Sequence, residues 1–183
     1  MQLTKPQARR EIEELNLPEV FVALFDGTTK LLELGLSQPV RAFRPFTVRY
    51  PGTLIPLFEQ GGETYFCETT PEGRRFIAFN LDSPEEVTVF GCSFQCVLAA
   101  LFMVFWEDER NDYLLPMLAD RLEFLYLTDL LDVLSTASKL AREPYLIWRR
   151  KFWAECDAAE RQEALALDFT TEKSWNPWSW QAA

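Results

Sequence analysis

Four short segments with strand character follow one another between residues 54 and 90, and turn residues separate them. Their sequences are LIPLFEQ, ETYFCET, RFIAFNL and EVTVF, with Gly61-Gly62, the sequence TPEGR and Pro84 in the breaks. Short strands joined by brief turns predict an antiparallel meander. The third segment is largely apolar on both faces, which predicts an inner position in the sheet.

The most apolar stretch of the chain, residues 92–106, comes directly after these segments. It is 15 residues long and contains Gln95. A helix that spans a bilayer needs roughly 20 apolar residues, so this stretch is too short for one. A helix that is apolar nearly all round is buried, and Ser93 can cap its first turn. The stretch therefore predicts a core helix packed against the sheet.

The N-terminal part of the chain is less clearly patterned. A helix is predicted to begin at Thr4, whose hydroxyl can cap it, and to end before Leu17-Pro18. The next segment, VFVALF over residues 20–25, fits a strand or a helix equally well by its periodicity. Prolines at six-residue intervals then exclude a continuous helix, and residues 43–50 are the best strand candidate there.

The C-terminal part changes character, because leucines recur every three or four residues after residue 109 and strand signals are absent. This predicts two or three helices, followed by an amphipathic helix in which Ile147, Trp148 and Phe152 share a face. The whole chain is therefore predicted to be an α+β domain with an antiparallel sheet of about four to six strands. Residues 1–112 would form the core, and residues 113–183 a helical extension packed on it as one globular unit.

The absence of histidine excludes many kinds of active site. The chain has no residue for a Ser-His-Asp or Cys-His pair, nor for a zinc site with histidine ligands. A glycine-rich phosphate loop is also absent. Adjacent carboxylates at 107–109 point in different directions on a helix, so they are poorly placed to share a metal ion. These absences exclude much catalytic chemistry, and we predict no catalytic residue, metal or cofactor.

The cysteines and the N-terminal residues give two further expectations. The spacings of Cys67, Cys92, Cys96 and Cys156 match neither a zinc ribbon nor a redox Cys-x-x-Cys motif, so buried free thiols are expected. The first 16 residues carry no apolar signal core, which predicts a cytoplasmic protein that makes no membrane contact.

The charge of the chain is concentrated in its middle third. The net charge is −10 and the pI is about 4.6, which disfavours direct binding to nucleic acid. Residues 59–123 contain 13 acidic and 4 basic residues. This excess either serves only as a solvated face or forms a docking surface for a basic protein. The predicted contact residues are Glu59, Glu63, Glu68, Glu72, Glu85, Glu86, Glu107, Asp108 and Glu109.

Three tryptophans lie close together near the C-terminus, at Trp175, Trp178 and Trp180. Exposed tryptophans are unfavourable in water, so these side chains either pack back onto the domain or contact a partner. The tail is therefore an alternative binding segment.

The segment PGTLIPLFEQGGETYFCETTPEGRRFIAFNLDSPEEVTVFGCSFQCVLAALFMVFWEDE, roughly residues 51–109, resembles the SUKH superfamily. In that superfamily a strand ending in an acidic residue, here LIPLFE, is followed by two further strands and a closing helix, here residues 93–106. The resemblance implies a non-enzymatic binding module. Many bacterial members of that superfamily neutralise polymorphic toxins, often nucleases, by docking on them.

The charge and the resemblance together predict an immunity protein whose acidic surface meets a basic toxin domain. An alternative is a regulatory scaffold that binds a cellular protein or peptide through the Trp-rich tail. A carboxylate-dependent hydrolase is a third interpretation, with no residue pattern that favours it.

Overall fold

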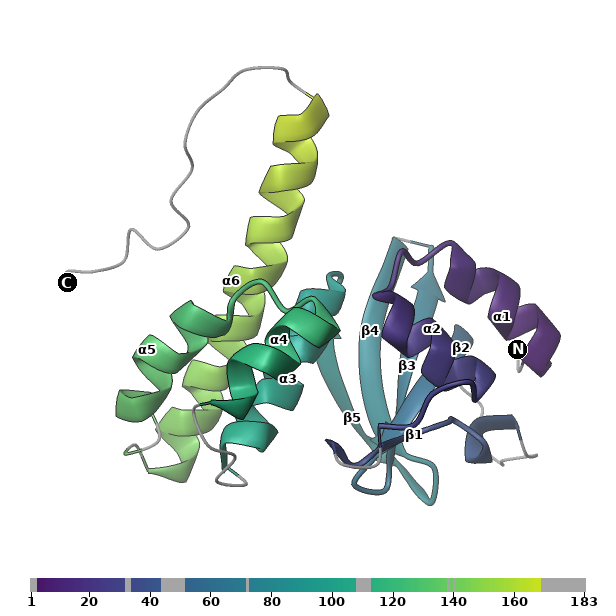
Figure 1. The fold of residues 1–183 in the computed structure, drawn as a ribbon, viewed down its shortest axis with the longest axis horizontal. Coiled ribbons are helices and arrows are strands. Elements are labelled where there is room, and N and C mark those ends of the chain that lie inside the picture. The colour runs from purple at the N-terminus through teal and green to yellow at the C-terminus, as the bar shows by residue number, and fades with distance from the viewer. Residues whose placement is uncertain are drawn as a thin grey trace.

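The computed structural model describes residues 3–31, 34–43, 52–71, 73–107, 113–137, 139 and 141–168, without the side chains of 84, 85 and 162–168. Along the chain, two helices precede a sheet, and four helices follow it. The predicted α+β class is confirmed: the described residues form a five-stranded antiparallel sheet and six α-helices (Figure 1).

The sheet is a meander in which each strand pairs with its neighbour in sequence. Its order is β1-β2-β3-β4-β5, and every pair is antiparallel. The third predicted strand segment corresponds to β4, which has a partner on each side, as its two apolar faces indicated. The strands are β1 (Leu36–Ser37), β2 (Thr53–Gln60), β3 (Glu63–Thr70), β4 (Gly73–Asn80) and β5 (Ser83–Gly91).

The two N-terminal helices lie together on one half of the sheet and contact β2. Helix α1 (Lys5–Glu13) begins after Thr4, whose backbone N–H and hydroxyl both donate to Gln7 Oε1 at 2.9 and 2.8 Å. The predicted helix start is therefore confirmed. The segment that follows, which fitted a strand or a helix, forms helix α2 (Glu19–Asp26). The ring centroid of its Phe21 lies 5.3 Å from that of Phe58 of β2.

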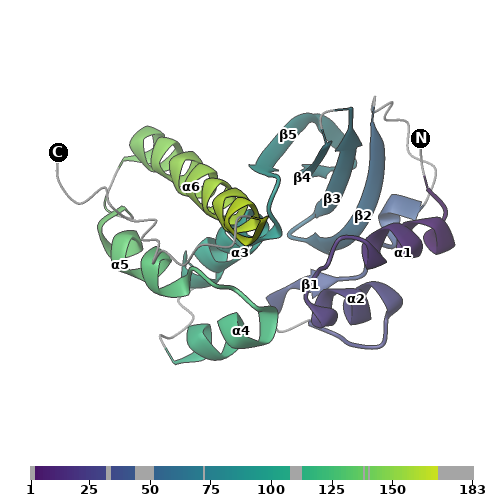
Figure 2. The same ribbon diagram turned by 90° about the horizontal axis from the view of Figure 1, so that it is seen from above.

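The remaining helices cover the other half of the sheet and extend away from it (Figures 1 and 2). Helix α3 (Phe94–Glu107) follows β5 directly and is buried along most of its length, as predicted. The Ser93 Oγ accepts the Gln95 N–H at 3.0 Å, which confirms the predicted cap. The chain continues through α4 (Leu114–Leu122), α5 (Leu127–Ala137) and α6 (Arg142–Asp168).

The two faces of the sheet belong to different clusters of the core. Phe58, Tyr65, Phe76 and Phe90 point toward the helices, where Phe90 meets Trp153 of α6 at 5.1 Å between ring centroids. The opposite face carries a smaller cluster of Ala42, Leu54, Phe66, Ile77 and Phe79. The period-two alternation of the strands produces this division.

Two local expectations differ from the structure. Ile147 is 66% exposed and does not share the buried face of α6, which Phe152, Trp153 and Cys156 occupy at helical spacing. The sequence favoured a strand over residues 43–50. In the structure, Phe43 is the last residue of a 3-10 helix, Arg41–Phe43, and residues 44–50 lie outside the described part of the chain. Among the described helices, none has the length and apolar character to cross a membrane.

Candidate functional site

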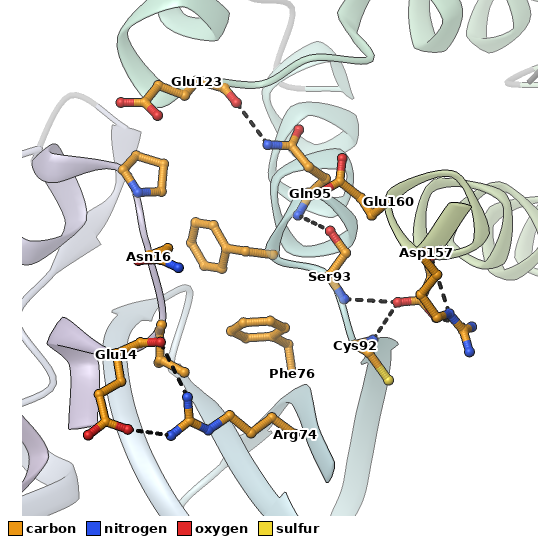
Figure 3. Close-up of a pocket in the computed structure, with 14 residues that line it drawn as sticks. Glu14, Asn16, Arg74, Phe76, Cys92, Ser93, Gln95, Glu123, Asp157 and Glu160 are labelled. Carbon is orange, nitrogen blue, oxygen red and sulfur yellow. Dashed lines mark hydrogen bonds and ion pairs between the residues drawn. The ribbon is translucent and has the colours of Figure 1, made fainter. Parts of the chain in front are cut away.

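An open cleft of about 410 Å³ lies where the two helical halves of the molecule meet the sheet. We call it the seam cleft. Its lining comes from the α1–α2 connection, the start of β4, the start of α3, the α4–α5 connection and α6 (Figure 3). The lining residues are Glu14, Leu15, Asn16, Pro18, Arg74, Phe76, Cys92, Ser93, Phe94, Gln95, Glu123, Asp157, Glu160 and Arg161.

Two phenylalanines give the seam cleft its apolar part. The rings of Phe76 and Phe94 meet edge to face, with 5.4 Å between their centroids. The Phe94 ring also packs against Phe21 of α2, with 4.9 Å between the ring centroids. Phe94 therefore bridges the N-terminal helices and the sheet, and one side of it faces the cleft. Leu15 and Pro18 add to this apolar lining.

A buried carboxylate holds the α6 side of the cleft in place. Asp157, only 5% exposed, accepts the backbone N–H groups of Cys92 and Ser93 at 2.6 and 2.8 Å. Its second oxygen accepts from Arg161. Asp157 thereby satisfies two donors at the N-terminus of α3, which a helix cannot pair internally. This contact joins residues 64 and 65 positions apart in the sequence.

The opposite walls are held by side chains that bind backbone groups. Gln95 donates from Nε2 to the Glu123 carbonyl at 2.9 Å and accepts the Leu125 N–H at 3.0 Å, which joins α3 to the α4–α5 connection. Arg74 donates to the Glu14 carboxylate at 3.0 Å and to its carbonyl at 3.3 Å. The cleft thus has walls that are positioned before any ligand binds.

The two non-glycine residues with positive φ in the described part of the chain are both cleft residues. They are Asn16, with φ 49°, and Glu123, with φ 56°. Such backbone conformations cost free energy in residues other than glycine, and they gather at binding and catalytic sites.

Charge is unequal around the cleft. The lining residues include four acidic residues, Glu14, Glu123, Asp157 and Glu160, and two basic residues, Arg74 and Arg161. Both guanidinium groups already pair with carboxylates of the lining. In Figure 3, the Glu123 carbonyl faces Gln95, whereas its carboxylate points away from Gln95 and Glu160; the Arg74–Glu14 pair lies at the opposite end of the cleft.

Cys92 brings an exposed thiol to the cleft. The prediction of buried free thiols is confirmed for Cys67, Cys96 and Cys156 and is wrong for Cys92. Burial raises the pKa of the Cys67 thiol to about 12 and also raises the pKa values of Cys96 and Cys156. The thiolate is the reactive form, so burial makes these three thiols unreactive. Cys92 is exposed and is therefore the accessible position for alkylation.

The predicted acidic contact residues do not form one continuous face. Glu86 and Glu107 are exposed, whereas Glu59 and Glu63 are half-buried on opposite faces of the sheet. Glu59 accepts the Arg41 N–H at 2.8 Å, and Glu107 accepts the Tyr145 hydroxyl. Glu72, Asp108 and Glu109, the side chain of Glu85, and Trp175, Trp178 and Trp180 lie outside the described residues.

Glu68 is buried, so the prediction that it lies on the acidic surface is wrong. It is 2% exposed and accepts from Arg75 Nε of the neighbouring strand at 2.6 Å. In the sequence, Glu68 belongs to an alternating strand pattern that does not show which face is covered. The structure covers this face, and the carboxylate is stabilised by its cross-strand partner.

Glu63 gives a testable pH dependence. Burial raises the pKa of its carboxyl, and the nearby Arg149 lowers it in part. A raised pKa in the folded state means that Glu63 stabilises the protein most when protonated and that this contribution is lost as pH rises through its pKa. We therefore expect Glu63→Gln to increase the free energy of urea unfolding at pH 7. The increase should vanish near pH 3, and an equal gain at both pH values would contradict this account.

The described residues contain no group of three histidine, cysteine, aspartate or glutamate side chains that could hold a metal ion. The seam cleft was not predicted from the sequence, because its lining comes from five separate segments. Only the potential of Ser93 to cap a helix pointed to one of its residues. The chain matches no protein-family model, no curated protein and no solved structure.

Proposed function

We propose that this protein is a non-enzymatic binding module of the cytoplasm that docks a basic protein partner, as an immunity protein docks a toxin domain. The observation that carries the proposal is the concentration of acidic residues in residues 59–123, several of which are exposed. Glu86, Glu107, Asp120 and Glu123 are all exposed. Opposite potentials speed association and select the partner.

The toxin assignment rests on the resemblance of residues 51–109 to the SUKH superfamily. An antiparallel meander followed by a helix supports this assignment, and the structure has one strand more than the resemblance describes, β5, before the helix. The alternative, a scaffold that binds through the Trp-rich tail, stays a prediction, because residues 169–183 lie outside the described part of the chain.

The surface-charge test compares two triple variants that change the net charge equally. One carries Glu86→Lys, Glu107→Lys and Asp120→Lys, within the acidic third; the control carries Glu19→Lys, Asp132→Lys and Glu143→Lys, also exposed but outside it. Proteins captured from the native host by the wild-type chain are identified by mass spectrometry, purified, and titrated by calorimetry at low and high salt. We expect a basic partner whose affinity falls at least about tenfold in the first variant and much less in the control.

A functional assay completes this test. The captured partner should stop the growth of a heterologous host when it is expressed alone, and co-expression of this protein should restore growth. A partner without a basic surface, or equal affinities of the two triple variants, would overturn electrostatic docking. Loss of binding on deletion of residues 174–183, with the fold preserved, would favour the tail instead.

A further inference from the structure

The seam cleft is open and partly apolar, and α6, which forms one of its walls, leads into the Trp-rich tail. We propose that the tail, residues 174–183, packs back into the seam cleft of its own chain and places a tryptophan side chain against Phe76 and Phe94. The sequence leaves open whether these tryptophans pack back or contact a partner. The proposal chooses the first alternative and names its place, and it does not depend on the proposed function, because no partner takes part.

The length of chain beyond the cleft is sufficient for this contact. Three residues of α6 line the cleft, the last of them Arg161, and the helix continues for seven residues to Asp168. This stretch of helix is about 10 Å long. Trp175 follows seven residues after Asp168, and an extended chain of seven residues spans at most about 23–25 Å. Trp175 can therefore return to the cleft, and the two later tryptophans have more chain available.

The end of α6 also lies at the right end of the molecule. In Figure 1, the α1–α2 connection, which lines the cleft, lies at the top of the sheet, and α6 continues upward past it. In Figure 2, seen from above, the yellow end of α6 lies beside α3, between the two helical halves. The chain therefore leaves α6 close to the seam and not on a remote face.

The lining suits an aromatic side chain. The rings of Phe76 and Phe94 meet edge to face, an arrangement in which aromatic rings attract one another and which an indole ring can extend. Leu15 and Pro18 widen the apolar lining. The cleft volume of about 410 Å³ lies within the range of roughly 300–1,000 Å³ that is typical of pockets for small molecules. The cleft can therefore admit an indole.

The charged groups of the lining favour a neutral occupant. Arg74 and Arg161 each pair with a carboxylate of the lining, and Glu160 accepts the Tyr126 hydroxyl at 2.9 Å. A charged segment would have to compete with these contacts. Residues 174–183 contain no charged side chain, so they leave the contacts intact.

Two physical effects favour the contact within one chain. A tryptophan side chain carries about 150–250 Å² of surface, and its exposure to water is unfavourable. A short connection to α6 also keeps the tail at an effective concentration in the millimolar range near the cleft. Because the cleft walls are already held by hydrogen bonds, little conformational entropy is lost there on docking.

Cys92 reports whether the cleft is covered, because its thiol is exposed and lines the cleft. Its alkylation by N-ethylmaleimide, a neutral reagent, is followed by mass spectrometry in the full chain. The tryptophan variant carries Trp175→Ala, Trp178→Ala and Trp180→Ala, and the control variant carries Asn176→Ala, Ser179→Ala and Gln181→Ala. We expect alkylation of Cys92 at least about threefold faster in the tryptophan variant than in the wild type, and nearly unchanged in the control variant.

A second pair of variants tests the cleft side of the contact. Leu15→Gln makes the apolar lining polar, and Leu125→Gln makes the same change at an exposed leucine that does not line the cleft. Only Leu15→Gln should speed the alkylation of Cys92. In the tryptophan variant it should have little further effect, because the contact that it disturbs is already lost. Thermal unfolding checks that all variants are folded.

The peptide SWNPWSWQAA, residues 174–183, should slow the alkylation of Cys92 when it is added to the tryptophan variant. The same peptide with alanine at its three tryptophan positions should not. Equal alkylation rates in the wild type and the tryptophan variant would overturn the proposal. Protection of the wild type that grows with protein concentration would overturn it too, because the tail would then enter the cleft of a second copy. Neither result bears on the proposed function, which the partner titrations test separately.

Discussion

Replacing Gly91 by alanine is expected to lower the free energy of unfolding by about 3 kcal/mol. Gly91 has φ 146°, a conformation that L side chains rarely adopt. A Cβ atom at this position would lie 3.0 Å from both Cγ and Oδ1 of Asp157. The substitution therefore strains the backbone and also pushes against the carboxylate that holds the start of α3. Urea unfolding followed by circular dichroism measures the loss.

The control for this experiment is Gly73→Ala. Gly73 has φ 134°, close to the value at Gly91, but an added Cβ would have no neighbour within 4 Å. It should therefore show only the conformational cost, about 1–2 kcal/mol. Because Asp157→Ala removes the opposing carboxylate, it should also reduce the further cost of Gly91→Ala. Equal losses of unfolding free energy in Gly91→Ala and Gly73→Ala would show that the contact with Asp157 adds nothing to the cost of the substitution at Gly91.

Replacing Arg75 by alanine is expected to lower the free energy of unfolding by about 3 kcal/mol, the typical effect of removing one partner from a buried ion pair. The Glu68 carboxylate, 2% exposed in the intact protein, would lose the guanidinium that donates to it at 2.6 Å. Glu68→Ala should cost less, because Arg75 is 42% exposed and can be hydrated when the carboxylate is absent. Replacing both, with Glu68→Leu and Arg75→Met, should recover most of the stability.

Arg74 is the matched control on the same strand. It pairs with Glu11 and Glu14, which are both substantially exposed, so Arg74→Ala should cost less than about 1 kcal/mol. Calorimetric unfolding of the two alanine variants compares them directly. Similar losses for Arg74→Ala and Arg75→Ala would mean that burial of Glu68 does not determine the strength of its ion pair.

The regular elements of the middle of the chain were predictable because their signals are local. Turn residues separate β2, β3, β4 and β5, and each strand carries its own alternation. The apolar stretch that becomes α3 and the cap at Ser93 were equally visible. Helix α2 was ambiguous, because a short apolar run fits a strand as well as a helix; its buried residues Phe21, Leu24 and Phe25 have helical spacing.

The amino-acid sequence alone predicts the strands of the meander, the core helix and the concentration of negative charge, because these depend on neighbouring residues or on composition. Which carboxylates are exposed depends on the packing of the folded chain, since Glu68 and Glu86 lie in similar strand patterns and differ in what covers them. The packing of distant elements also forms the seam cleft, which brings Glu14 and Arg161 to one site. Such proximity depends on how distant elements pack together, and packing leaves no periodic signal in the sequence.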